Sequence, residues 1–165
     1  MAEEPEELPE REETRAERAD RNWNELTQEL RVTQTGVQIL TAFLLILPFQ
    51  QRFTDISDSE KTLYLTLVSL SIITSVLMVA PVSLHRVLFR QGRKVRLVQI
   101  ADRIMTIALV FLALTLIGTV SFVFNVVVGG VTVWIATAAA TLLIVGLWVT
   151  MPWYARVTED PYRED

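Results

Sequence analysis

The amino-acid sequence predicts an all-α, polytopic membrane protein with four transmembrane helices. Residues 32–51, 62–84 and 104–155 contain no Asp, Glu, Lys, Arg or His side chain, and the mean hydropathy of the 165 residues is +0.36. A soluble domain of this size needs charge over its whole surface. A helix that crosses the bilayer needs instead about 20 consecutive apolar residues. The charge-free stretches therefore indicate an integral membrane protein.

The N-terminal segment is strongly acidic. Its first twenty residues include nine Asp or Glu, only three Arg, and the prolines Pro5 and Pro9. It has no basic region followed by a short apolar core, so it is not a signal peptide. With so few apolar side chains it cannot bury enough surface to offset the entropy of ordering. We expect residues 1–21 to form a cytoplasmic tail that is largely disordered or partly helical.

A short amphipathic helix is expected just before the first span. Asn22 lies three residues ahead of Glu25, which is a helix-start pattern, and Trp23, Leu26 and Leu30 follow at helical spacing. This stripe fits either the headgroup region of a bilayer or the ends of the protein's own helices.

The transmembrane domain is expected to comprise residues 22–155, with a short tail at 156–165. The span at 32–51 is strongly apolar only over 36–49, so it either crosses fully or re-enters. The second, 62–84, follows a Ser57–Glu60 capping box that predicts a helix over residues 58–91. The charge-free stretch 104–155 is too long for one crossing. Gly129 and Gly130 predict a tight turn between antiparallel spans 104–127 and 131–154.

The distribution of basic residues predicts the orientation. Thirteen of the fifteen Lys and Arg residues lie before the first span, between the second and third, or after the fourth. The positive-inside rule therefore places both termini in the cytoplasm. Aromatic residues flank both ends as expected for interface anchors: Trp148, Trp153 and Tyr154 on the inner side, and Phe49, Phe53 and Tyr64 on the outer side.

Polar and small residues within the spans predict helix contacts. Gln34, Gln38 and Thr41 share one face of the first span and are expected to point inward, where they form interhelical hydrogen bonds or line a permeation path. The Ser and Thr hydroxyls of the second span are expected to bond their own backbone or to allow close packing. The expected seam residues are Gly118, Ala136, Ala140 and Gly146.

The densest basic cluster lies between the second and third spans. It follows His85 and comprises Arg86, Arg90, Arg93, Lys94 and Arg96. This cluster serves as the orientation signal or contacts anionic lipid headgroups. The cluster lacks interleaved aromatic residues for stacking on bases, and the protein as a whole is acidic. Nucleic acid is therefore not expected as a partner.

No constellation of residues indicates an enzyme. The chain has no cysteine and one histidine, and it lacks a phosphate-binding glycine loop. We expect no catalytic residue, no metal site and no cofactor.

Two segments resemble a family of small actinobacterial integral membrane proteins that carries only a domain-of-unknown-function label. They are residues 29–53, with the run ELRVTQTGVQIL, and residues 80–90, APVSLHRVLFR. The resemblance extends over residues 25–154 and implies a bacterial plasma-membrane location. Some members carry the label sodium:proton antiporter, which the resemblance transfers as an alternative function.

The residues favour a non-enzymatic structural or accessory four-helix bundle, in an anionic lipid bilayer, as a homo-oligomer or in a larger complex. Proton–cation exchange needs a titratable group within the membrane, usually Asp, Glu or His. The nearest candidates for a transporter are Asp102 and His85, which lie at the edge of the spans. Antiport therefore ranks second.

Overall fold

The computed structural model describes residues 14–88 and 94–158, and every regular element within these ranges is helical. Four helices are long and apolar enough to cross a membrane. This confirms the predicted all-α class and the number of apolar spans. The elements in chain order are α1 (Arg15–Ile46), η1 (Leu47–Phe49), η2 (Gln51–Asp55), α2 (Asp58–Leu88), α3 (Lys94–Val127), α4 (Val131–Val145), the π-helical turn η4 (Gly146–Thr150) and α5 (Met151–Thr158).

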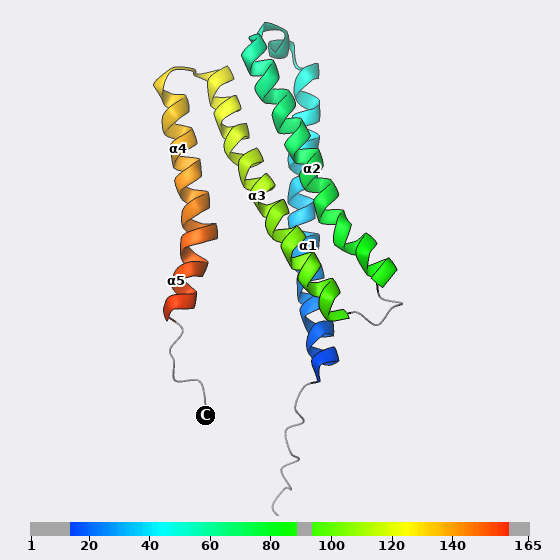
Figure 1. Ribbon diagram of the computed structural model, residues 1–165. Coiled ribbons are helices and arrows are strands. Elements are labelled where there is room, and N and C mark those ends of the chain that lie inside the picture. Colours follow the sequence, from blue (N-terminus) through cyan, green and yellow to red (C-terminus); the bar gives the residue numbers. More distant parts are fainter. Residues whose placement is uncertain (1–13, 89–93, 159–165) are drawn as a thin grey trace, which may run out of the picture.

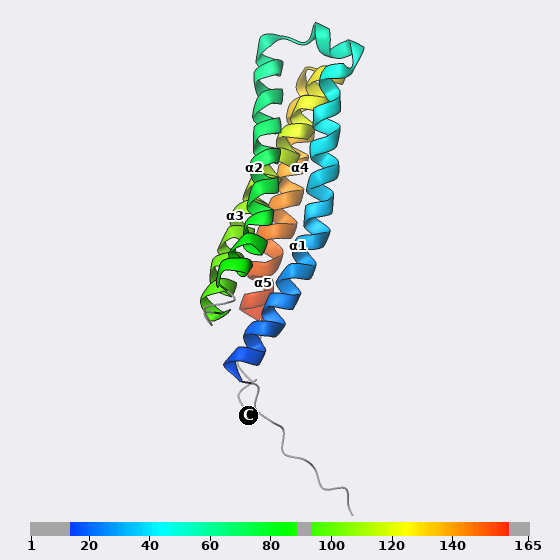
Figure 2. The ribbon, with the colours of Figure 1, turned by 90° about the vertical axis from the view of Figure 1, so that its right-hand side faces the viewer.

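The helices run up and down, so their ends form two groups (Figure 1). The start of α1, the end of α2, the start of α3 and α5 share one end, which we call the terminal end. The turns η1 and η2 and the connection between α3 and α4 share the other, which we call the turn end. Figure 2 shows η1 and η2 bridging the upper ends of α1 and α2.

Helix α1 begins earlier than predicted. Thr14 caps it: its hydroxyl accepts from Glu17 N, and Glu17 Oε2 accepts from Thr14 N at 2.8 Å. The Thr14 hydroxyl also donates to Glu17 Oε2 at 2.7 Å, and this bond, followed by that from Thr14 N, lowers the pKa of the Glu17 carboxyl. The predicted separate helix start at Asn22 is wrong, because residue 22 lies inside α1, where the helix already supplies hydrogen-bond partners for the backbone N–H groups. Residues 15–21 of the predicted tail are helical; residues 1–13 lie outside the described ranges.

Helix α1 is one uninterrupted helix of 32 residues. At 1.5 Å per residue it is about 48 Å long, against about 30 Å of hydrocarbon. Its length favours full crossing over re-entry for the first span.

The stripe before the first span packs against the protein's own helices. Leu26 and Leu30 are buried in a cluster with residues of α2 and α3, and Trp23 packs against the same cluster. Of the two interpretations left open by the sequence, the structure selects packing within the chain. The buried members of this terminal cluster are Leu26, Leu30, Val37, Met78, Ala101, Met105, Ala108 and Leu112.

A second cluster closes the turn end. Its buried members are Leu44, Ile56, Tyr64, Leu67 and Phe122, which come from α1, the segment before α2, α2 and α3. Tyr64 is only 5% exposed. Its hydroxyl donates to Leu44 O at 3.1 Å, and its ring meets Phe53 edge to face. Tyr64 is therefore a buried tie between α1 and α2, and its prediction as an interface anchor is wrong.

Two local predictions are confirmed at the turn end. Ser57 Oγ accepts from Glu60 N, and Glu60 Oε2 accepts from Ser57 N, which is the predicted capping box of α2. Gly129 and Gly130 form the predicted turn, with φ of 70° and 65°. These values lie in the left-handed region that favours glycine. Within the described residues α2 ends at Leu88, and the predicted extension to residue 91 lies outside them.

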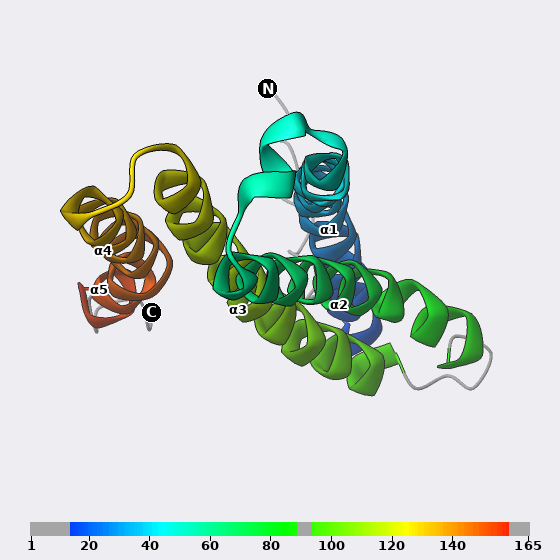
Figure 3. The same cartoon turned by 90° about the horizontal axis from the view of Figure 1, so that it is seen from above.

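Helix α4 packs on α3 and stands apart from α1 and α2 (Figure 3). The arrangement is a three-helix bundle with α4 packed on α3 at one edge, so the expected four-helix bundle is found only in this open form. Ala136 and Ala140 lie on the half-buried face of α4, as predicted, but Gly146 faces open space. The other faces carry large exposed apolar side chains such as Trp134 and Leu142. In a bilayer, lipid tails would solvate these faces, so no hydrophobic force draws α4 over the bundle.

Candidate functional site

The basic cluster is only partly within the described ranges. His85 and Arg86 lie in the last turn of α2, and Arg86 is exposed. Lys94 and Arg96 lie in the first turn of α3. Arg90 and Arg93 fall outside the described residues. The end of α2 and the start of α3 both lie at the terminal end. Contact of the basic cluster with anionic lipid headgroups stays a prediction.

Asp102 lies on the exposed surface of α3, more than two turns after the helix begins. Its neighbour Ala101 is fully buried in the terminal cluster with Leu26 and Leu30, which places Asp102 near the terminal end. Apart from the backbone bonds of the helix, the one bond to Asp102 within the described chain joins its carbonyl oxygen to the Thr106 hydroxyl, at 3.0 Å. Asp102 and His85 belong to different helices, α3 and α2.

The polar face of α1 points only partly in its predicted direction. The most deeply buried residues of α1 are Val37 and Leu44, at 1% exposure. Gln34 and Thr41 are half-buried beside this stripe, whereas Gln38 is exposed. The Thr41 hydroxyl donates to Val37 O at 2.8 Å. The inward orientation predicted for Gln38 is therefore wrong, because the buried stripe of α1 runs one residue earlier.

The hydroxyls of α2 bond their own helix, as predicted. Each donates to a backbone carbonyl oxygen three or four residues earlier, at 2.8–2.9 Å. Ser71 and Thr74 are buried at the centre of the bundle. The residues are Thr66, Ser69, Ser71, Thr74 and Ser75. This removes them as donors for a substrate path.

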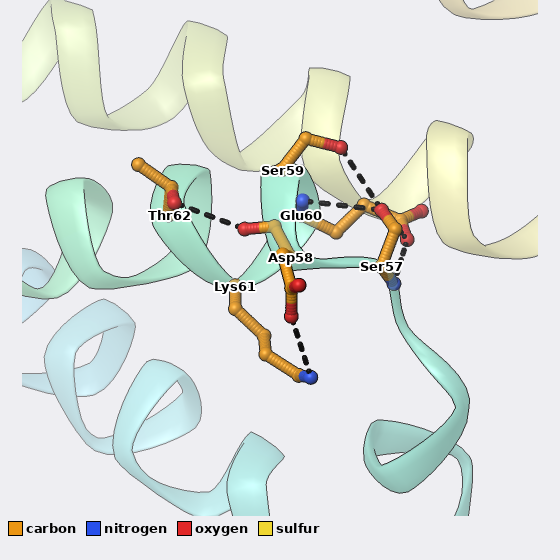
Figure 4. Close-up of polar contacts among 6 residues, drawn as sticks. All are labelled: Ser57, Asp58, Ser59, Glu60, Lys61 and Thr62. Carbon is orange, nitrogen blue, oxygen red and sulfur yellow. Dashed lines mark hydrogen bonds and ion pairs between the residues drawn. The ribbon is translucent and has the colours of Figure 1, made fainter.

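The turn end carries a polar network that the sequence analysis missed. Asn125 Nδ2, near the end of α3, donates to Glu60 Oε1 at 2.8 Å, while Glu60 Oε2 accepts from both Ser57 N and Ser57 Oγ at 2.7 Å. Figure 4 shows this first turn of α2, where Lys61 also pairs with Asp58. The signal that could have indicated this contact is the antiparallel arrangement of α2 and α3, because it brings the start of α2 beside the end of α3.

A family model of unknown function, DUF6328, matches residues 12–152. The chain belongs to the DUF6328 family. The match covers all four apolar helices, so the family corresponds to the helical body and not to one segment of it. A search of curated proteins and a search of solved structures each gave no significant match.

Within residues 14–88 and 94–158 of this DUF6328 protein, no group of three His, Asp or Glu side chains is placed to hold a metal ion. Neither Glu60 nor Asp102 therefore belongs to such a group. What the helices do bring together is structural: the two apolar clusters, the Tyr64 tie, and the Glu60–Asn125 bond at the turn end.

Proposed function

We propose that the protein is a multi-pass integral protein of the bacterial plasma membrane with a non-enzymatic, structural or accessory role. One observation carries the proposal: large apolar side chains are exposed along all four apolar helices. Phe43 of α1, Ile73 of α2, Val110 of α3 and Trp134 of α4 are examples. In water such a surface would aggregate, whereas lipid tails solvate it.

In this proposal the terminal end faces the cytoplasm. Among the described residues, most of the Lys and Arg lie in the start of α1, the end of α2 and the start of α3, which share this end. The turn end carries only Arg52 and Lys61. The positive-inside rule then places both termini and the basic cluster against the cytoplasmic leaflet, where anionic lipids attract Lys and Arg.

Single cysteines test this orientation, because the natural chain has none. Thr54→Cys in η2 and Val128→Cys in the turn after α3 are expected to react with a membrane-impermeant maleimide in intact cells. Gln28→Cys in α1 is expected to react only after permeabilisation. All three native side chains are exposed, so accessibility within the fold does not bias the comparison.

The opposite pattern would invert the orientation. Labelling of Val128→Cys without Thr54→Cys would mean that the first span does not cross. Recovery of the chain in the soluble fraction after cell breakage without detergent would overturn the membrane location altogether.

Ion exchange is the alternative that the labels of similar proteins imply, and the positions of the carboxyl groups argue against it. Residues 32–51, 62–84, 104–127 and 131–154 contain no Asp, Glu or His. Asp102 is exposed near the terminal end, and within the described residues it belongs to no group of three acidic or histidine side chains that could hold an ion. Exchange across a bilayer needs a group that alternately holds a proton or a cation inside the membrane.

Liposomes that contain the purified protein provide the functional test. With an imposed pH gradient, we expect no collapse of the gradient when sodium or potassium is added. Protein-free liposomes and liposomes with the Asp102→Asn variant are the controls, and all three preparations are expected to behave alike. A cation-dependent collapse that disappears in Asp102→Asn would contradict the accessory role and establish exchange through Asp102.

A further inference from the structure

Gln38 occupies an unusual place for an amide. It is exposed on the surface of α1, and it lies seven residues after Arg31 and eight before Ile46, where α1 ends. At 1.5 Å per residue these separations are about 10 and 12 Å along the helix. Gln38 is therefore near the middle of the charge-free part of α1, too far from either end for its side chain to reach water.

This amide lacks a partner within the described residues. In the part of the chain that the structure describes, no hydrogen bond reaches the side chain of Gln34 or Gln38. Most Ser and Thr hydroxyls of the spans differ, because they bond their own helix, as those of Thr41 and Ser75 do. An amide has two donors and an acceptor, and hydrocarbon offers it nothing in return. The exposed face around Gln38 is thus unsuited to lipid alone.

The residues around Gln38 form a second seam on α1. Gln34, Gln38, Thr41 and Leu45 follow one another at spacings of four, three and four residues, which is the spacing of a helix–helix seam. We call these four residues the glutamine seam. It lies beside the buried stripe that holds Val37 and Leu44, and its central and last members, Gln38 and Leu45, are exposed.

We propose that a second copy of this chain covers the glutamine seam, with the two α1 helices parallel and the Gln38 amides hydrogen-bonded to each other. Two features favour a second copy. An amide is both donor and acceptor, so it complements itself. A two-fold axis along the membrane normal places each seam residue opposite its own copy, and copies with the same orientation have parallel α1 helices. The inference rests on the proposed membrane location.

Cross-linking in native membranes tests this interface without altering the glutamines. Leu45→Cys places the only cysteine of the chain on the seam, seven residues from Gln38. Phe43→Cys is the matched control, since Phe43 is at least as exposed as Leu45 but lies on another face of α1. We expect a disulfide-linked dimer on mild oxidation of Leu45→Cys and little or none with Phe43→Cys.

A second substitution tests the amides themselves. In the Leu45→Cys background, Gln38→Leu is expected to weaken dimerisation by about five- to thirty-fold, the factor that one interhelical hydrogen bond in a membrane supplies. Gln28→Leu is the control, because Gln28 is also an exposed α1 glutamine but lies outside the seam. It is expected to leave the dimer yield unchanged.

Several outcomes would overturn the inference. They are a membrane-integrated Leu45→Cys protein that stays monomeric, equal cross-linking at Leu45 and Phe43, a dimer that Gln38→Leu does not weaken, or a cross-link to a different protein. Each of these leaves the proposed membrane location intact. Failure of the proposed function is recognised separately, by loss of the protein from the washed membrane pellet.

Discussion

Replacement of Gly118 by leucine should separate α2 from α3 and lower the free energy of unfolding by about 2–3 kcal/mol. A Cβ at Gly118 would overlap with Cδ2 of Leu67 on α2. Leu67 is only 1% exposed and belongs to the cluster at the turn end, where Tyr64 and Phe122 surround it. Leu67 therefore has no open space into which it can retreat. The measurement is SDS titration of the purified protein in mixed micelles.

A compensating variant makes this prediction specific to the contact. Leu67→Ala alone should also destabilise the protein, because it leaves a cavity. The double variant with Gly118→Leu and Leu67→Ala exchanges large and small side chains across the seam. It should therefore be more stable than Gly118→Leu alone. If the two substitutions merely add, their side chains do not share one space and the seam is wrongly placed.

Gly36 provides the matched glycine control. It also lies within a helix, but a Cβ there would meet no atom within 4 Å. Gly36→Leu should leave stability unchanged or raise it slightly, because glycine is a poor helix former. A loss as large as that of Gly118→Leu would indicate a general effect of replacing helical glycines.

Local signals in the sequence were sufficient where one short pattern determines a structure. Ser57 and Glu60 specify a helix start, and Gly129 with Gly130 specifies a turn, whatever the rest of the chain does. The start of α1 shows the limit of such patterns. Thr14–Glu17 and Asn22–Glu25 have the same form, and only the continuity of the helix decides that the first is the cap.

The packing faces of the spans were harder to predict, for a physical reason. In a soluble helix, apolar periodicity marks the buried side. In a membrane span nearly every side is apolar, so this contrast disappears. Val37 and Gln38 are adjacent, and either residue's stripe has helical spacing, yet only that of Val37 is buried. The edge position of α4 was hard to predict for the same reason, because α4 has no polar face that distinguishes its packed side from its lipid side.

The residues of the candidate site were identified from the sequence, but their positions in the fold were predicted only in part. Charge alone put His85, Arg86 and Asp102 near the terminal end, where the described helices have them. The Glu60–Asn125 bond depends on the pairing of α2 with α3 over 65 residues of sequence, which no local pattern encodes. The buried contact of Tyr64 was also not predicted, because an aromatic residue near a span end is as typical of an interface anchor as of a buried contact.

Replacement of Tyr64 by alanine should be the most damaging single truncation at the turn end. It would remove a buried ring that packs on Phe53 and Phe122, and with it the hydroxyl that donates to Leu44 O in the last turn of α1. Ring truncations in soluble cores cost about 3–5 kcal/mol. Part of that is transfer to water, which lipid does not impose. We therefore expect a loss of about 2–3 kcal/mol in the same SDS titration.

Two further variants divide this loss into its parts. Tyr64→Phe keeps the ring and removes the hydroxyl, so it should cost only about 1 kcal/mol. The cost stays small because Leu44 O also accepts from Leu47 N. Phe49→Ala truncates a ring at the same end that is 86% exposed, and it should have little effect. If Tyr64→Ala proves no worse than Phe49→Ala, the ring is not buried between α1, α2 and α3. Since Tyr64 supplies the hydrogen bond that joins α2 to the end of α1, α1 would then be held by the apolar contacts of Leu44 and of the terminal cluster.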